Sequence, residues 1–450
     1  MKNMEKSLVI YSERVILPEA IGAYSITIVE GEITAIQKGK IVLKGMPFYD
    51  YRDLVIMPGI IDPHVHINEP GRTEWEGFYT GTTAAAAGGI TTLVDMPLNS
   101  SPVTTNVREL ESKLAASKHK LHINSGFWGG IIPGNTADLL PLAKAGVLGF
   151  KAFLTHSGID EFPNADEATL RAAYKALKGT NLPILAHCEL TTGTYDTTLI
   201  EQPTNYQAYL ESRPRKWEND AVDLMLKLAE EYQHPTHIVH LSSSDSLDTI
   251  RAAKKRNVPV TVETCPHYIC FHAEAIPNGD TRYKCAPPIR ELANNKLLWG
   301  ALLDGTLDFI GSDHSPAPPN IKALDTGNFK EAWGGISGIQ FTLSALWTEG
   351  QKYGLSLEYL RTILCEAPAK FIGYQDKKGK IATGYDADFV IWSPETSYIV
   401  TQETIQAKHK VSPYEGKPLQ GLVQSTFVNG KLVWENGSLK EKNEGSLLLN

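Results

Sequence analysis

The sequence lacks a long apolar run, and this lack argues against a membrane-spanning protein. No stretch of its 450 residues reaches the roughly 18 consecutive apolar residues of a spanning helix. The first apolar run ends before Ser12 and is too short for the apolar core of a signal peptide. We therefore expect a cytoplasmic protein without a membrane partner.

Basic segments and paired cysteines are also scarce. The chain carries 43 Lys and Arg against 51 Asp and Glu, a net charge of −8, and no basic block, so we expect no nucleic-acid partner. The five cysteines are scattered and never spaced as CxxC, which disfavours a disulfide framework and a structural zinc knuckle. They are Cys188, Cys265, Cys270, Cys285 and Cys365.

No GxGxxG fingerprint follows a predicted strand and no short repeat is present, which disfavours dinucleotide-binding and solenoid folds. Both ends of the chain instead show short alternating strands. One hairpin turn is indicated by the EGEI segment at 30–33 and another by the Asn-Gly pair at 429–430. We expect residues 1–56 and 379–450 to form one small β-sandwich.

The middle of the chain, residues 57–378, alternates β-branched apolar runs with helix-like segments. Eight such runs indicate a closed (β/α)₈ barrel, with an open doubly wound sheet as the alternative. The runs cover 55–67, 91–97, 121–130, 147–153, 183–189, 236–242, 259–267 and 307–315. Helix-like segments cover 79–89, 107–118, 168–179, 218–232 and 246–257.

Polar side chains stand at the carboxyl ends of five of these runs, where barrel enzymes hold their active sites. Any one of them has an ordinary structural explanation, but independent core residues would not all fall at the same end of five strands. Imidazole and carboxylate suit Zn²⁺, Co²⁺, Mn²⁺ or Fe²⁺. The candidate ligands are His64, His66, Lys151, His187, His240 and Asp313.

Lys151 is the informative member, because an ammonium group has donors only and cannot bind a cation. Reaction with CO₂ would turn it into a carbamate (N6-carboxylysine) that can bridge two metal ions. His64, His66 and Asp313 would then hold one ion, and His187 and His240 the other. Such a pair of ions lowers the pKa of a bridging water and polarises a carbonyl, while Asp313 moves the proton from the water to the leaving nitrogen.

Several motifs resemble the cyclic-amidase branch of the amidohydrolase superfamily. They are PGIIDPHVHINEPG (58–71), GGITTLVDMP (88–97), GFKAF (149–153), ETCPHY (263–268), CAPPIR (285–290), GSDHSP (311–316) and GKIATGYDADFVIW (379–392). The resemblance carries the six metal ligands over without a gap and gives Asp313 the role of general base. It also implies two divalent ions, usually zinc with cobalt or manganese as alternatives, and a homo-oligomer, often a homotetramer.

Within the branch, NEPGRTEWEGF (68–78), FWGG (127–130) and HKVSPYEG (409–416) resemble the members that hydrolyse the hydantoin ring of allantoin to allantoate, a step of purine degradation. Hydantoinase and dihydropyrimidinase activities remain alternatives. Dihydroorotase is less favoured, because Asn68 stands where that enzyme has an arginine for its anionic substrate. Arg72 and Arg290 are nearby cations that could replace it. Scaffold relatives that have lost metal ligands are disfavoured by the complete ligand set.

Substrate contacts are predicted from polar side chains and small residues near the same rim. Asn68 and Asn99 could pair with the edge of a ring, and the segment around Cys285 and Ala286 could do so through its main chain. Gly334 and Gly335 would let the backbone approach a ligand closely. We also expect a mobile lid at 155–166 and a polar C-terminal tail (438–450) whose leucines could pack on a neighbouring subunit. Trp128 and Trp333 are expected either in the pocket wall or in the core.

Overall fold

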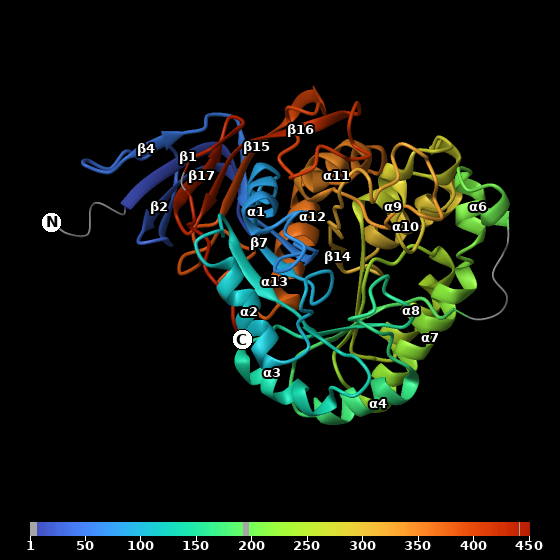
Figure 1. Ribbon diagram of the computed structural model, residues 1–450. Coiled ribbons are helices and arrows are strands. Elements are labelled where there is room, and N and C mark those ends of the chain that lie inside the picture. The colour runs from blue at the N-terminus through green and yellow to red at the C-terminus, as the bar shows by residue number, and fades with distance from the viewer. Residues whose placement is uncertain (1–6, 192–197, 441) are drawn as a thin grey trace.

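The computed structural model describes residues 7–191, 198–440 and 442–450. A barrel of parallel strands lies beside a β-sheet that both ends of the chain build together (Figure 1). The predicted fold class, a (β/α)₈ barrel with a small β-sandwich, is confirmed. Within the described ranges, no helix combines the length and the apolar sequence that a bilayer crossing requires.

The barrel strands follow one another in chain order, and all of their pairings are parallel. They are β6 (Ile60–Val65), β7 (Ile90–Asp95), β8 (Asn124–Phe127), β9 (Gly129–Gly130), β10 (Phe150–Phe153), β11 (Ile184–His187), β12 (Thr236–Ile238), β13 (Val260–Thr264) and β14 (Phe309–Ile310). β8 and β9 are two halves of one barrel strand, interrupted at Trp128. A parallel bridge between Val65 and His314 closes the barrel.

Helices pack around the barrel, and their ends follow local sequence signals. α2 begins after Asn106 and α4 after Asp166, whose side chains accept hydrogen bonds from the main chain of the first helical turn. The helices are α1 (Phe78–Ala87), α2 (Val107–Ser117), α3 (Leu139–Ala145), α4 (Glu167–Ala176), α5 (Thr198–Glu201), α6 (Tyr206–Glu211), α7 (Arg215–Tyr232), α8 (Leu247–Lys255), α9 (Pro266–Cys270), α10 (Leu292–Leu303), α11 (Thr342–Gly350), α12 (Leu357–Arg361) and α13 (Ala367–Phe371).

The outer sheet has nine strands from both chain ends. They are β1 (Ser7–Ile16), β2 (Ile21–Val29), β3 (Glu32–Lys38), β4 (Phe48–Asp50), β5 (Val55–Pro58), β15 (Phe389–Ile399), β16 (Pro418–Val428), β17 (Lys431–Glu435) and β18 (Ser438–Leu439). The sheet folds over its own core, since Tyr49 of β4 packs edge-on against Phe427 of β16 at 5.7 Å between ring centroids.

Both predicted hairpin turns are present in this sheet. Glu30 and Gly31 connect β2 to β3 with φ of 52° and 87°, and Asn429 and Gly430 connect β16 to β17 with φ of 51° and 76°. Two successive residues with positive φ are typical of the turn that matches the twist of a tight hairpin. The sequence therefore fixes these turns locally, through residues that tolerate the left-handed region.

The chain passes from the outer sheet into the barrel at Gly59, between β5 and β6. A Cβ atom at this position would lie 2.1 Å from Oγ1 of Thr91, so only glycine fits where the two parts meet. The chain returns to the sheet at β15. The division into a sandwich domain (1–56 and 379–450) and a barrel domain (57–378) stays a prediction, and residues 1–6 and 441 of it lie outside the described residues.

The described part of the C-terminal tail pairs with β8 of its own chain, and the expected contact of its leucines with a neighbouring subunit stays a prediction. Ser125 of β8 donates its main-chain N–H to Ser446 at 2.9 Å and accepts one from Leu448 at 2.9 Å. Leu448 is 7% exposed, whereas its neighbour Leu447 is 43% exposed. Figure 1 shows the C-terminus next to α2 and α3. The tail can pair here because the break after β8 leaves that edge of the strand free.

We predict that Leu448→Ala destabilises the protein by about 2 kcal/mol, because it removes a buried side chain from the tail contact. Calorimetry would record this loss as a Tm several degrees lower. Leu447→Ala is the matched control and should leave Tm unchanged. An equal effect of the two substitutions would contradict the described packing of the tail.

Candidate metal centre and active site

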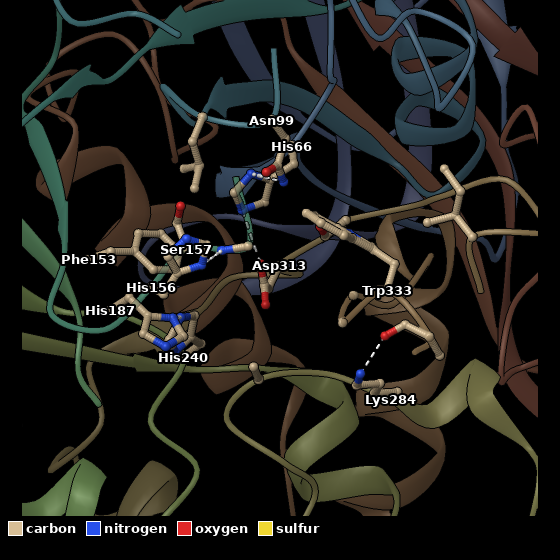
Figure 2. Close-up of a pocket in the computed structure, with 18 of the residues that line it drawn as sticks. His66, Asn99, Phe153, His156, Ser157, His187, His240, Lys284, Asp313 and Trp333 are labelled. Atoms are coloured by element: carbon tan, nitrogen blue, oxygen red, sulfur yellow. Dashed lines mark hydrogen bonds and ion pairs between the residues drawn. The ribbon is translucent and has the colours of Figure 1, made fainter. Parts of the chain in front are cut away.

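The carboxyl ends of the barrel strands bring most of the predicted ligands to one cavity. Its volume is about 400 Å³, and five of the six candidate ligands line it (Figure 2). These five are His64, His66, His187, His240 and Asp313. The sixth, Lys151 of β10, is fully buried. The convergence arises because parallel barrel strands all end at the same rim.

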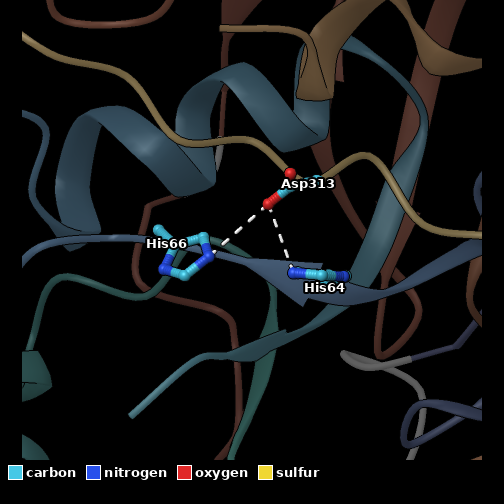
Figure 3. Close-up of side chains that lie close together, drawn as sticks. All are labelled: His64, His66 and Asp313. Carbon is cyan, nitrogen blue, oxygen red and sulfur yellow. Dashed lines mark ion pairs between the residues drawn. The ribbon is translucent and has the colours of Figure 1, made fainter. Parts of the chain in front are cut away.

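The first group is formed by His64 and His66 at the end of β6 and by Asp313 after β14 (Figure 3). One carboxylate oxygen of Asp313 lies 3.2 Å from Nε2 of His64 and 3.5 Å from Nε2 of His66. Burial alone would raise the pKa of Asp313, but His64 and His66 hold it well below its usual value. The three side chains can therefore surround one cation with an ionised carboxylate.

The second group is a pair of imidazoles from β11 and the end of β12. Nδ1 of His187 lies 2.9 Å from Nε2 of His240, and both rings are buried. Burial, together with the neighbouring His187 and Lys151, holds the pKa of His240 well below its usual value. Two neutral ring nitrogens that face each other suit a second cation, because a metal ligand must offer a free lone pair.

Lys151 fits this centre poorly as an ordinary lysine. Its Nζ has no hydrogen-bond partner among the described residues and lies 5.0 Å from the ring centroid of Phe153. Burial lowers the pKa of Lys151 to about 8. A buried charge without a partner is costly. An amine in this place is therefore better suited to chemical conversion than to an ion pair.

Two buried carboxylates behind the histidines fix which ring nitrogen faces the cavity. Glu263 of β13 accepts a hydrogen bond from Nδ1 of His64. Glu189 lies 2.7 Å from Nε2 of His187 and forms an ion pair with Arg213. Such partners orient a metal-binding imidazole and hold its tautomer. Sequence reasoning missed them, although Glu263 opens the ETCPHY motif and Glu189 follows His187 at the two-residue spacing of a strand face.

The predicted substrate contacts divide into two sets. Asn99, Ala286, Gly334 and Gly335 line the cavity, whereas Asn68 and Cys285 do not. The side-chain amide of Asn99 lies 3.3 Å from Nδ1 of His66. That of Asn68 donates to the Pro316 carbonyl at 3.3 Å.

The main-chain carbonyl of Cys285 is already used within the protein, since it accepts a hydrogen bond from the hydroxyl of Tyr209 at 2.7 Å. Other lining residues were not among the predicted substrate contacts, although Phe153 ends the GFKAF motif and His156 and Ser157 lie in the predicted lid. They include Phe153, His156, Ser157, Tyr209, Arg213 and Lys284.

Four of the predicted site residues have a backbone conformation that side chains other than glycine rarely adopt. The φ angles are 40° for His240, 45° for Asp313, 66° for Asn68 and 68° for Asn99. Strain of this kind persists where the surrounding structure fixes it, and it concentrates at functional sites. Here it turns side chains toward the rim directly after the strands end.

The segment 155–166 borders the cavity through Gly158 and anchors itself through Phe162, which is fully buried. Its motion as a lid stays a prediction. Trp333 lines the cavity and packs edge-on against Trp75, with ring centroids 4.8 Å apart. Trp128 is a core residue whose indole N–H donates to the Pro63 carbonyl at 2.8 Å, so the core, and not the pocket wall, is the correct one of the two expected places.

A parallel-stranded barrel with histidine and aspartate groups at its carboxyl rim is typical of metal-dependent barrel enzymes. The amidohydrolase family profile matches residues 55–433, and the chain belongs to that family. An allantoinase of Streptomyces avermitilis is 45% identical over 98% of both chains. An allantoinase of Arabidopsis thaliana is 43% identical over 98% of this chain and 90% of its own.

Among solved structures, the L-hydantoinase (dihydropyrimidinase) of Arthrobacter aurescens superimposes with a TM-score of 0.91 at 28% identity, over 98% of this chain and 99% of its own. A D-hydantoinase from Thermus sp. has a TM-score of 0.89 at 27% identity, over 98% of both chains. The predicted resemblance to the cyclic-amidase branch is confirmed.

We predict that Glu263→Gln weakens metal binding about 10- to 100-fold, because the amide no longer holds His64 in the required tautomer. Metal content after dialysis against a graded chelator measures this effect. Glu230→Gln, at an exposed Arg256 pair on α7, is the control and should retain its metal. Equal metal retention by the two variants would show that Glu263 does not support the ligand.

Proposed function

We propose that this amidohydrolase opens the hydantoin ring of allantoin by hydrolysis and releases allantoate, a step of purine degradation. The observation that carries the proposal is the convergence of His64, His66 and Asp313 on the floor of one cavity. The relatives cited above, at 43–45% identity over nearly the whole chain, are allantoinases. The protein is a hydrolase that acts on cyclic amides.

Two divalent ions fit the donor set, and zinc is the proposed metal, with cobalt or manganese as alternatives. His64, His66 and Asp313 would hold one ion, and His187 and His240 the other. When bound, such ions lower the pKa of a water and polarise the scissile carbonyl. The facing ring nitrogens and the ionised Asp313 support this assignment.

Lys151 would join the two ligand groups as a carbamate. The neutral amine adds to the carbon of CO₂ and loses one proton, which leaves a singly negative carboxylate on Nζ. Burial that lowers the pKa of Lys151 favours the neutral amine needed for this step. The product gives the unpartnered nitrogen an anionic group that can bind a cation on either side.

Asp313 is the proposed catalytic base. It accepts a proton from the attacking water while the new carbon–oxygen bond forms at the ring carbonyl. It then returns that proton to the ring nitrogen as the carbon–nitrogen bond breaks. The ring amide becomes a carboxylic acid and a terminal ureido group. The acid then releases its proton to the solvent and is left as a carboxylate.

The cavity favours a neutral substrate over an anionic one. Neither Arg72 nor Arg290 lines it, because they pair with Glu161 and Glu218. Arg213 lines it, but Glu189 already neutralises its charge. Lys284 and Lys330 also line the cavity, but Nζ of Lys284 donates to the Ala332 carbonyl and burial lowers its pKa to about 7. The described lining therefore offers no free arginine for the carboxylate of dihydroorotate, and a neutral ureide ring suits it better.

The proposal extends to the location and the assembly of the protein. We place it in the cytoplasm, as a homo-oligomer and specifically a tetramer. The absence of a basic block and of an apolar run in the sequence supports this choice of compartment. Allantoin is the proposed small-molecule partner.

A turnover panel tests the proposed function. The protein is loaded with zinc, cobalt or manganese in bicarbonate buffer, and kcat/KM is compared for allantoin, hydantoin, dihydrouracil and dihydroorotate. We predict that allantoin is preferred about 100-fold or more, a difference of about 3 kcal/mol in transition-state stabilisation.

The other outcomes of the panel are equally informative. Preference for hydantoin or dihydrouracil would keep the metal chemistry and reject allantoin as the substrate. Dihydroorotate turnover would reject the neutral-substrate argument. Bound metal without turnover of any of the four compounds would reject the proposed activity.

A further inference from the structure

Lys322 is a buried lysine without a carboxylate partner in the part of the chain that the structure describes. It lies in the long segment after β14, is 2% exposed and forms no ion pair there. Its Nζ instead donates to three main-chain carbonyls, those of Lys284 at 3.1 Å, Trp333 at 3.0 Å and Gly335 at 2.8 Å. Burial of an ammonium group is costly unless its donors are all used, as they are here.

The three carbonyls belong to two segments that form one wall of the cavity. Lys284 precedes Cys285 and Ala286, and Trp333 to Gly335 form the second segment. The N–H of Gly335 also donates to the Lys284 carbonyl at 2.9 Å. A Cβ atom on Gly334 would lie 3.9 Å from the Ala286 nitrogen, so the two segments run side by side.

The direction of the Trp333 carbonyl decides where the next N–H points. A trans peptide plane sets its C=O and its N–H in opposite directions. Because the Trp333 carbonyl is directed at the buried Lys322, the N–H of Gly334 points away from Lys322, and Gly334 itself lines the cavity. That N–H has no acceptor among the residues of the described ranges. It is therefore a free donor at the cavity wall.

We propose that Lys322 is a positioning residue for substrate recognition, which holds the segments around Lys284 and Gly334 so that the Gly334 N–H donates to a carbonyl oxygen of the cyclic ureide. The inference rests on the proposed function for the identity of the ring. Lys322 does not touch the substrate. It acts through the main chain, because its Nζ donates to three main-chain carbonyls.

Lys322→Met tests this role, because methionine has a similar length and no donor. We expect KM for allantoin to rise at least tenfold, while kcat and the metal content stay close to those of the wild type. An interaction made equally with substrate and transition state changes KM in this way. A loss of metal or of kcat without a change in KM would overturn the proposal.

Lys378→Met is the matched control for the loss of a buried lysine. Lys378 is 4% exposed and pairs with Asp388 at 2.6 Å and Asp386 at 2.8 Å, outside the cavity. This variant should lose stability and keep its KM. A rise in KM equal to that of Lys322→Met would show that the effect is general destabilisation, and would overturn the proposal.

Lys322→Gln covers the case in which the methionine variant does not fold. Glutamine keeps two N–H donors, so we expect a smaller rise in KM with kcat retained. An unchanged KM in a folded glutamine variant would overturn the proposal. Failure of both variants to fold would also overturn it, because Lys322 would then serve the fold and not recognition.

The result is independent of which cyclic amide proves to be the substrate. If the wild-type protein prefers hydantoin or dihydrouracil, allantoin fails as the substrate, and KM of the variants is measured with the preferred compound. A tenfold rise there would still support the role of Lys322. An unchanged KM would reject that role while leaving the assignment of the reaction intact.

Discussion

His66 donates its main-chain N–H to the carbonyl of His314 at 2.8 Å, and this contact closes the barrel between its first and last strands. The rest of the site depends on that closure. His64 and His66 are some 250 residues away from Asp313 in the sequence, yet the closure sets their imidazoles against one of its carboxylate oxygens. Without it, the histidine pair and the aspartate would occupy opposite edges of an open sheet.

The closed rim concentrates buried polar groups, and each group needs a partner that the fold must supply. Glu263 supplies one for His64 and Glu189 one for His187. The Nζ of Lys151 has no partner in the ranges that the structure describes, and neither have the side-chain oxygen of Asn99 and Nε2 of His267. Residues with partners are held in place, whereas the unpartnered amine is the group that remains free to react. The histidine and aspartate side chains can thus bind a metal ion as they stand, whereas Lys151 would first have to be converted to a carbamate.

Much of the fold and of the ligand set could be predicted, because strand alternation, hairpin turns and strand-end side chains are local signals. The Asn-Gly turn at 429–430 and the His64 and His66 pair needed only neighbouring residues. The break of a barrel strand at Trp128 and the pairing of Leu448 with β8 could not be predicted. The tail pairing joins β8 to the distant C-terminal end of the chain, and Trp128 at the break bonds to Asp95 and Pro63 of two other barrel strands.

The cavity wall, too, could be predicted from the sequence only where local signals determine it. The Gly334-Gly335 pair predicts that the backbone can approach a ligand closely, but it does not predict which way the peptide N–H and C=O groups point. Lys322 sets that direction through carbonyls about 10 to 40 residues away, and no periodicity marks it. Lys284 and Arg213 likewise line the cavity from segments without a motif. Sequence patterns therefore identified the candidate metal ligands better than the surface that would select the substrate.

The state of Lys151 tests the central claim most directly. The measurement is a crystal structure of the protein after reconstitution with zinc in bicarbonate buffer. The account predicts electron density for one CO₂ unit on Nζ of Lys151, with a metal ion beside each of its two oxygens. Two bound ions next to an unmodified lysine would contradict the bridging role. A single ion at His64, His66 and Asp313 would contradict the second ligand group.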